Sequence, residues 1–183
     1  MDVNYVNAHF IFKIRKVIRY IRLYGLLRTM AKVRGQYHML STVNFSGKSW
    51  LNPRCNSPEA VSRNVAIIGC GNYSFSNIAY YLAKYDKEFL RCTYDKNKNR
   101  SRSLCKFYNG LYATEDVAEI IADPNVKIVF IASNHASHAE YAISCLEHGK
   151  SVHIEKPHVV DNQQLERLIK AIKNNPHVNV YLG

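Results

Sequence analysis

From residue 64 onward, short apolar runs alternate with amphipathic stretches. The runs that predict buried strands are 64–69 (NVAIIG), 89–94, 111–113, 127–132 (KIVFIA), 151–154 and 178–182. The stretches between them predict helices, because their apolar residues recur at helical spacing. Strands that alternate with helices in this way are joined by right-handed crossovers. The pattern therefore predicts an α/β fold, a doubly wound parallel sheet of the Rossmann type with strand order 3-2-1-4-5-6.

Polar residues indicate where several of the predicted helices begin. Thr114 is a candidate N-cap for the helix that follows the third strand. Ser137 and Glu140 have the spacing of a capping box after the fourth strand, and Asp161 with Gln164 has the same spacing after the fifth. These residues therefore predict three helix starts.

The first 40 residues follow a different pattern. Apolar residues recur at i, i+3 and i+4, and the cations of the segment lie largely off that stripe: Lys13, Arg15, Lys16, Arg19 and Arg22. The spacing predicts a basic amphipathic helix over 9–32, bent or interrupted at Gly25. Residues 1–40 are thus a helical extension. Residues 41–63, rich in Ser, Asn and Pro, predict a linker that Trp50 and Leu51 could anchor to the domain at 64–183.

Charge separates the same two parts. The chain has 183 residues, of which 25 are basic and 14 acidic, a net charge of +11. Residues 1–60 hold ten basic and two acidic residues, a net +8, whereas 61–183 hold 15 and 12, a net +3. Most of the excess positive charge therefore lies in the N-terminal part of the chain. A hydrophobic content of 47% excludes a disordered chain.

Three interpretations of residues 9–34 remain open. The segment could pack on its own enzyme, on a partner subunit or on a further domain. It could instead lie on an anionic membrane surface, with aromatic residues near the headgroups. It could also bind nucleic acid, but no fold for base readout accompanies the charge, so specific nucleic-acid binding is not expected.

The five cysteines are odd in number and widely scattered, which favours neither a disulfide framework nor a zinc site. No metal site is predicted. A reducing, cytoplasmic location is expected, with peripheral membrane attachment under the second interpretation above. No run reaches the roughly 20 apolar residues that span a bilayer, and no signal-peptide cleavage site follows an apolar core.

Directly after the first predicted strand, the sequence reads Gly-Cys-Gly-Asn-Tyr-Ser. Gly69 permits a tight turn, and Gly71 lets a pyrophosphate approach the backbone. Asn72, Tyr73 and Ser74 open the following helix, where free N–H groups face a bound anion. Ser74 stands where the dinucleotide fingerprint has its third glycine. The segment predicts a phosphate-binding loop.

Asp95 lies 26 residues after Gly69, at the end of the second predicted strand. A carboxylate there accepts hydrogen bonds from ribose hydroxyls and repels a 2′-phosphate, which predicts NAD as the cofactor. Lys96 and Lys98 could receive that phosphate, so NADP is the less favoured alternative. A methyltransferase shares the loop and the acid, and it remains open at this point.

Two later segments carry a family resemblance. The fourth strand runs into Ala132-Ser133-Asn134-His135-Ala136-Ser137-His138, and the fifth ends in Glu155-Lys156-Pro157. In this order, residues 64–183 resemble the Gfo/Idh/MocA family of nicotinamide-dependent sugar and cyclitol oxidoreductases. The family commonly has Thr-Pro-Asn where this chain has Ser133, Asn134 and His135. The variant with histidine in third place resembles members linked to surface-polysaccharide or sugar-nucleotide gene sets.

The resemblance implies roles for these residues. Lys156 would be the catalytic residue beside the nicotinamide, where an ammonium can polarise the reacting oxygen. Glu155 would orient Lys156 or bind a ribose hydroxyl, with a surface carboxylate as the alternative. His138 is either a packing residue or a residue near the cofactor. Ser133, Asn134 and His135 would line the cofactor.

The resemblance also implies that the general acid or base, a histidine, and most of the substrate pocket belong to a second α/β domain absent from this sequence. We therefore expect the chain to bind a dinucleotide with little or no dehydrogenase activity alone. The intact enzyme would oxidise or reduce a secondary alcohol on a sugar, sugar nucleotide or cyclitol. The alternative is a non-catalytic dinucleotide-binding or interaction module.

Overall fold

A seven-stranded sheet organises the computed structural model, which describes residues 9–42, 49–51 and 62–183. The strands lie in the order β1-β4-β3-β2-β5-β6-β7. Their bounds are β1 Ser49–Leu51, β2 Val65–Ile68, β3 Leu90–Tyr94, β4 Tyr112–Thr114, β5 Ile128–Ile131, β6 Ser151–Ile154 and β7 Val180–Leu182. Strands β2 to β7 are mutually parallel. The predicted Rossmann sheet and its order 3-2-1-4-5-6 are therefore confirmed.

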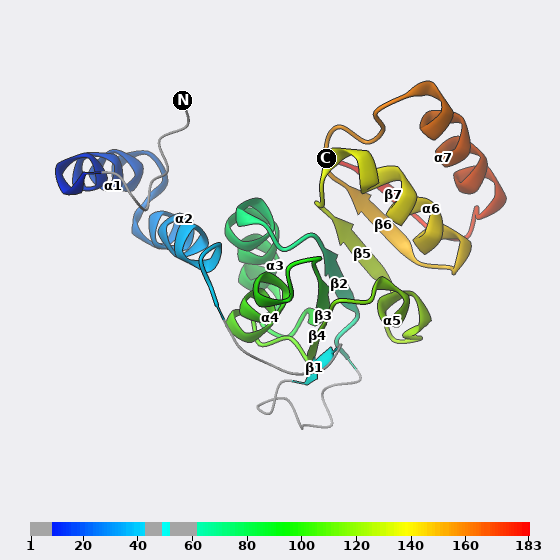
Figure 1. Ribbon diagram of the computed structural model, residues 1–183, viewed down its shortest axis with the longest axis horizontal. Helices are drawn as coiled ribbons and strands as arrows, with labels where there is room; N and C mark the ends of the chain where they lie inside the picture. Colours follow the sequence, from blue (N-terminus) through cyan, green and yellow to red (C-terminus); the bar gives the residue numbers. More distant parts are fainter. Residues whose placement is uncertain (1–8, 43–48, 52–61) are drawn as a thin grey trace.

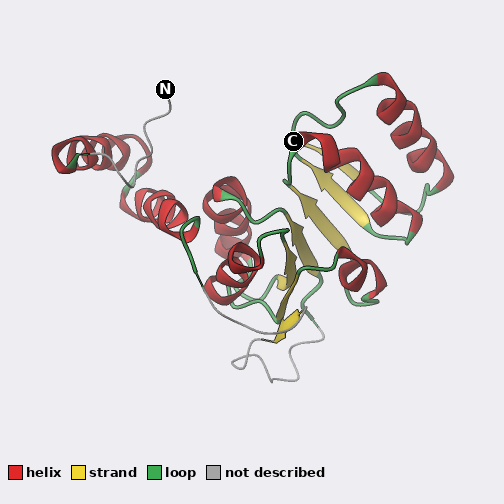
Figure 2. Ribbon diagram, viewed as in Figure 1, coloured by secondary structure: helices red, strands yellow, loops and turns green. Residues whose placement is uncertain are grey.

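Helices cover both faces of this sheet (Figures 1 and 2). On one face lie the π-helical turn η3 and the helices α3 and α4, and on the other lie α5, α6 and α7. The bounds are η3 Ser74–Ile78, α3 Ala79–Tyr85, α4 Lys98–Phe107, α5 Val117–Ala122, α6 His138–Glu147 and α7 Asn162–Asn174, with a 3-10 turn η4 at His135–Ser137.

Strands β2 and β5 at the centre of the sheet are apolar throughout, because both of their faces are covered. Ile67 of β2 and Phe75 of η3 belong to the core under η3 and α4. Ile68 of the same strand and Ile131 of β5 belong to the core under α6 and α7. Successive side chains of a strand point to opposite faces, so β2 contributes alternately to the two cores.

Strand β1 corrects the interpretation of residues 41–63 as a linker alone. It pairs antiparallel with β4 at the edge of the sheet, with Trp50 opposite Ala113. The guanidinium carbon of Arg102 lies 4.9 Å from the centroid of the Trp50 ring, so Trp50 anchors this segment. Leu51 does not, because 76% of its surface is exposed. Residues 43–48 and 52–61 lie outside the described residues.

One predicted helix cap is wrong and another is confirmed. Thr114 is the last residue of β4, and the cap of α5 is Asp116, whose side chain accepts from the backbone N–H of Ala118 at 2.9 Å. The strand therefore runs one residue farther than its short apolar pattern indicates. Asp161 caps α7 as predicted, accepting from the N–H of Gln164 at 2.7 Å.

The N-terminal extension forms two helices, α1 (Phe10–Tyr24) and α2 (Leu26–His38). The predicted interruption is present at Gly25, whose φ of +79° suits glycine. Helix α2 packs against η3, whereas α1 projects away from the sheet and none of its described residues is buried (Figure 1). Within the described part of the chain, no helix combines the length and apolar character that a membrane span requires.

Candidate functional site

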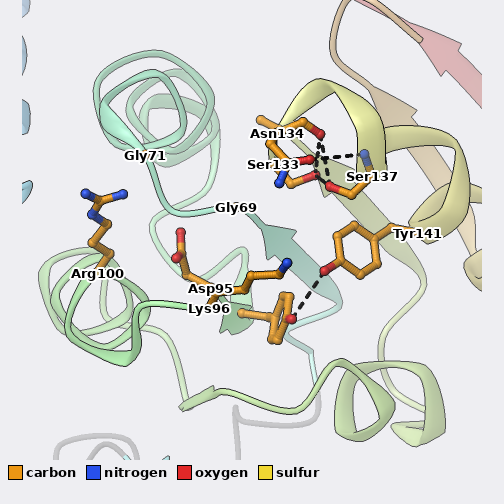
Figure 3. Close-up of a pocket in the computed structure, with 11 residues that line it drawn as sticks. Gly69, Gly71, Asp95, Lys96, Arg100, Ser133, Asn134, Ser137 and Tyr141 are labelled. Carbon is orange, nitrogen blue, oxygen red and sulfur yellow. Dashed lines mark hydrogen bonds between the residues drawn. The ribbon is translucent and has the colours of Figure 1, made fainter. Parts of the chain in front are cut away.

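A pocket of about 300 Å³ opens at the carboxyl ends of β2, β3 and β5 (Figure 3). Ligands of open α/β sheets bind at the carboxyl ends of the strands, at the point where the strand order in the sheet reverses. In this sheet the reversal lies between β2 and β5. Eleven residues line the pocket: Gly69, Gly71, Tyr94, Asp95, Lys96, Arg100, Ala132, Ser133, Asn134, Ser137 and Tyr141. Five of these are residues that the sequence assigned to the cofactor, namely Gly69, Gly71, Asp95, Ser133 and Asn134.

The two glycines of the loop differ in what surrounds them. Gly69 has a φ of +88°, and a Cβ placed on it would lie 2.5 Å from the backbone oxygen of Ala132 and the backbone nitrogen of Ser133. A Cβ on Gly71 would meet no atom within 4 Å. Gly69 is thus required for the turn to pass beside β5, whereas Gly71 leaves open space.

Ser74 takes the place of the third fingerprint glycine without disturbing the packing. Its side chain is fully buried, and its hydroxyl donates a hydrogen bond to the backbone carbonyl of Gly69. A serine suits this position because its hydroxyl is satisfied within the loop itself. Ser74 does not line the pocket.

The other two loop residues point in different directions. The side-chain oxygen of Asn72 lies against Gly35 of α2, so close that a Cβ on Gly35 would collide with this oxygen. Burial raises the pKa of Tyr73, and the negative charge of the Glu155 carboxylate raises it further. Neither the Asn72 side chain nor the Tyr73 side chain lines the pocket.

Asp95 is held at the end of β3 by two backbone groups. Its Oδ2 accepts from the N–H of Cys70 and its Oδ1 from the N–H of Asn97, both at 2.7 Å. The carboxylate lies at the pocket with Lys96 and Arg100 beside it (Figure 3). Each carboxylate oxygen has a second lone pair, so both remain available to a ligand hydroxyl.

The opposite wall comes from the loop after β5. The side chain of Asn134 accepts from the N–H of Ser137 at 3.2 Å, and the hydroxyls of Ser133 and Ser137 are 2.8 Å apart (Figure 3). The predicted capping box at Ser137 and Glu140 is therefore wrong, since the side chain of Ser137 makes no cap hydrogen bond to α6. Asn134 instead caps the 3-10 turn η4, and Ser137 lines the pocket.

His138 links two loops from a buried position. Its Nδ1 lies 2.8 Å from the carbonyl oxygen of Pro157, and its Nε2 lies 3.1 Å from that of Ser133. Only 1% of its surface is exposed. His138 thus ties the Glu-Lys-Pro segment to the wall of the pocket without lining it, while His135 on η4 is exposed.

Glu155 and Lys156 follow β6, next to the strand that carries the wall loop. The N–H of Glu155 donates to the carbonyl of Ile131 at 2.9 Å, and the Glu155 carboxylate accepts from the N–H of Lys156 at 3.1 Å. The peptide bond between Lys156 and Pro157 is cis. Lys156 is exposed, and its side chain is not among those that line the pocket.

Comparison with protein families agrees with this arrangement. Residues 63–182 match the Gfo/Idh/MocA family model, described as an oxidoreductase family with an NAD-binding Rossmann fold. The chain belongs to the Gfo/Idh/MocA family.

Individual relatives of this Gfo/Idh/MocA chain match over the same part. Oxidoreductase P35 of Formosa agariphila is 29% identical over 114 residues, 61% of this chain and 35% of its own. The scyllo-inositol 2-dehydrogenase (NADP(+)) IolU of Bacillus subtilis is 33% identical over 86 residues, 47% of this chain and 26% of its own. The chain therefore spans about a third or less of these relatives.

The fold also matches solved structures. The WlbA dehydrogenase of Chromobacterium violaceum, solved with NADH and UDP-GlcNAcA, has a TM-score of 0.61 at 18% identity over 66% of this chain and 34% of its own. At this level of identity the likeness concerns the fold.

Among the lining residues that the sequence did not assign to the site are Arg100, Ser137 and Tyr141. Arg100 reaches the pocket from the first turn of α4, and Ser137 and Tyr141 from the start of α6. The Tyr141 hydroxyl lies 3.2 Å from that of Tyr94, and burial raises the pKa of Tyr141. A usable signal existed, because Ser137 and Tyr141 are four residues apart and so share one helix face.

Proposed function

We propose that the chain binds a nicotinamide dinucleotide in the pocket at the ends of β2, β3 and β5. The observation that carries this proposal is the open space at Gly71, between the fixed carboxylate of Asp95 and the start of a helix. Membership of an oxidoreductase family with an NAD-binding Rossmann fold supports it. In the intact protein the domain would serve an oxidoreductase that acts on a secondary alcohol of a sugar, sugar nucleotide or cyclitol.

The geometry suggests how the dinucleotide would lie. Its pyrophosphate would rest on Gly71, where backbone N–H groups at the helix start favour negative charge. The hydroxyls of the adenosine ribose would donate to Asp95. Ser133 and Asn134 would face the nicotinamide half, with Tyr73 and Glu155 beyond them. The inositol dehydrogenase among the relatives supports a cyclitol or similar polyol as substrate class.

Lys156 is the residue that we propose for the chemical step. A bound nicotinamide supplies hydride chemistry. The Lys156 ammonium would donate a hydrogen bond to the substrate oxygen and stabilise its negative charge. Glu155 would orient this lysine, because its carboxylate already binds the Lys156 backbone N–H. If the chain were instead a non-catalytic module, the pocket would bind dinucleotide but Lys156 would have no such role.

Cofactor preference gives the direct test. We expect NADH to bind more tightly than NADPH, because Asp95 repels a 2′-phosphate. Separate titrations of the full 183-residue chain, followed by nicotinamide fluorescence, measure both constants. Tighter binding of NADPH would contradict the proposed preference, and binding of neither would contradict the proposed function.

We also expect no more than slow turnover of inositols and sugars by these residues alone. Turnover at rates normal for dehydrogenases would contradict the proposal that these residues supply the cofactor-binding part of the enzyme without its substrate pocket.

A second property follows from α1. We propose that this helix binds an anionic membrane surface. Its apolar stripe is exposed at Ile14, Ile18 and Ile21, and its sequence holds five cations and no acid. A helix of this kind gains from apolar burial and from attraction to anionic lipid. Charge therefore favours lipid over a second basic copy of this chain.

Vesicle sedimentation tests the membrane proposal. The full chain is expected to bind vesicles that contain phosphatidylserine at low salt, and to bind less at high salt because screening weakens the attraction. Ile18→Asp should reduce binding at least tenfold, whereas Ile169→Asp on α7 should not, although the two residues are about equally exposed, at 46% and 42%. No binding at low salt would refute the proposal, as would a concentration-dependent dimer that Ile18→Asp abolishes.

A further inference from the structure

The last residue of α2 touches the phosphate loop. His38 is 5% exposed, and its Nε2 lies 2.8 Å from the carbonyl oxygen of Cys70, the residue between the two glycines of the loop. Its Nδ1 lies 2.9 Å from the hydroxyl of Ser103 on α4. His38 thus bridges the loop and α4, the helix that follows β3, although it lies outside the residues that match the family.

The chemistry of these partners fixes the state of the ring. A carbonyl oxygen only accepts hydrogen bonds, so Nε2 must carry a proton. The Ser103 hydroxyl can donate, so a neutral ring with Nδ1 as acceptor satisfies both contacts. Burial lowers the pKa of His38, which favours this neutral form. The ring also stacks on Phe75, with centroids 4.5 Å apart.

The Cys70 backbone is held on both sides. Its N–H donates to Asp95, and its carbonyl accepts from His38. In a planar trans peptide the C=O and the next N–H point in opposite directions. Holding the Cys70 carbonyl toward α2 therefore directs the N–H of Gly71 away from α2. That N–H belongs to the loop residue with open space beside it.

Further contacts fix α2 over the helix that the loop opens. Gly35 leaves room for the side chain of Asn72, the residue after Gly71. Arg28 donates a hydrogen bond to the side chain of Asn77, and its guanidinium carbon lies 4.8 Å from the centroid of the Tyr81 ring. The position of His38 is therefore set by several contacts along one helix.

We propose that His38 is a positioning residue of the dinucleotide site: by holding the Cys70 carbonyl it orients the phosphate loop for the pyrophosphate. The N-terminal extension then contributes to dinucleotide binding through His38, whatever else α1 binds. This inference rests on the proposed dinucleotide binding.

Three variants of the full chain test this inference. His38→Ala should weaken NADH binding about 5- to 10-fold, the size expected for one lost buried hydrogen bond. His38→Gln should recover most of the affinity, because its amide N–H can reach the carbonyl. Tyr37→Ala changes the neighbouring residue, which is 51% exposed, and should bind like the wild type. Affinities are measured by NADH fluorescence at a temperature where circular dichroism shows every variant folded.

The outcomes separate the inference from the proposed function. A wild-type chain that binds neither NADH nor NADPH refutes the function. A wild type that binds, with a folded His38→Ala variant of equal affinity, overturns the positioning role, even if that variant melts at a lower temperature. If His38→Ala does not fold, Ser103→Ala decides. It frees the ring on the α4 side and should weaken NADH binding about threefold, and unchanged affinity would overturn the inference.

Discussion

Replacing Gly69 by alanine is expected to lower the free energy of unfolding by about 3 kcal/mol. An L-residue in the left-handed region costs about 1–2 kcal/mol. The added Cβ would also lie 2.5 Å from backbone atoms of Ala132 and Ser133, which belong to the exit of a central strand and cannot move aside as a flexible side chain could. Overpacking of this kind costs about 1–3 kcal/mol. Urea unfolding followed by circular dichroism measures the sum.

Gly71→Ala is the matched control, because it makes the same chemical change two residues away. No heavy atom lies within 4 Å of the added Cβ, so stability should stay within about 0.5 kcal/mol of the wild type. NADH binding should nevertheless weaken tenfold or more, since the methyl group would occupy the space proposed for the pyrophosphate. A Gly69→Ala chain as stable as the wild type would contradict our account of the turn, and full NADH affinity in Gly71→Ala would contradict the placement of the phosphates.

The central sheet was predictable because its signals are local. Strands β2 and β5 are covered on both faces, so residues 65–68 and 128–132 are apolar without interruption. The crossover rule then limits the possible strand orders, and 3-2-1-4-5-6 is the order of the Rossmann type. Strand β1 has no such signal, because Ser49–Leu51 is short and is stabilised by pairing with β4, more than 60 residues later in the chain. Long-range pairing of this kind leaves no pattern in a three-residue segment.

The residues of the candidate site divide in the same way, into those with a local sequence signal and those that packing places at the site. The positions of Gly69, Gly71 and Asp95 at the pocket were predictable, because they follow from a fixed spacing after two strands. Arg100 and Tyr141 enter the pocket from helices, and which helical residue faces a pocket depends on how the helix packs. Asn72 points to α2 because Gly35 leaves space there. That partner lies in a segment whose docking position the loop motif does not encode.

Replacing Asp95 by serine is expected to change the ratio of NADPH to NADH affinity by about 100-fold in favour of NADPH. The carboxylate would lie beside the 2′-phosphate, and two charges a few ångströms apart near a protein surface repel by about 3 kcal/mol. Serine removes the charge and adds a hydroxyl that can donate to the phosphate. Lys96 and Arg100, at the same end of the pocket, remain to attract it. Separate fluorescence titrations of the variant with both cofactors measure the ratio.

The ratio is the informative quantity because the substitution also disturbs the loop. Asp95 accepts from the N–H of Cys70, so its loss should weaken binding of both cofactors about equally, and this common effect cancels. Arg100→Ala in the Asp95→Ser chain should reverse most of the gain in NADPH affinity, whereas Arg167→Ala, which removes an exposed arginine paired with Glu140 on α6, should leave it unchanged. An unaltered ratio in Asp95→Ser would mean that the ribose lies elsewhere. The carboxylate would then hold the loop through Cys70 without selecting the cofactor.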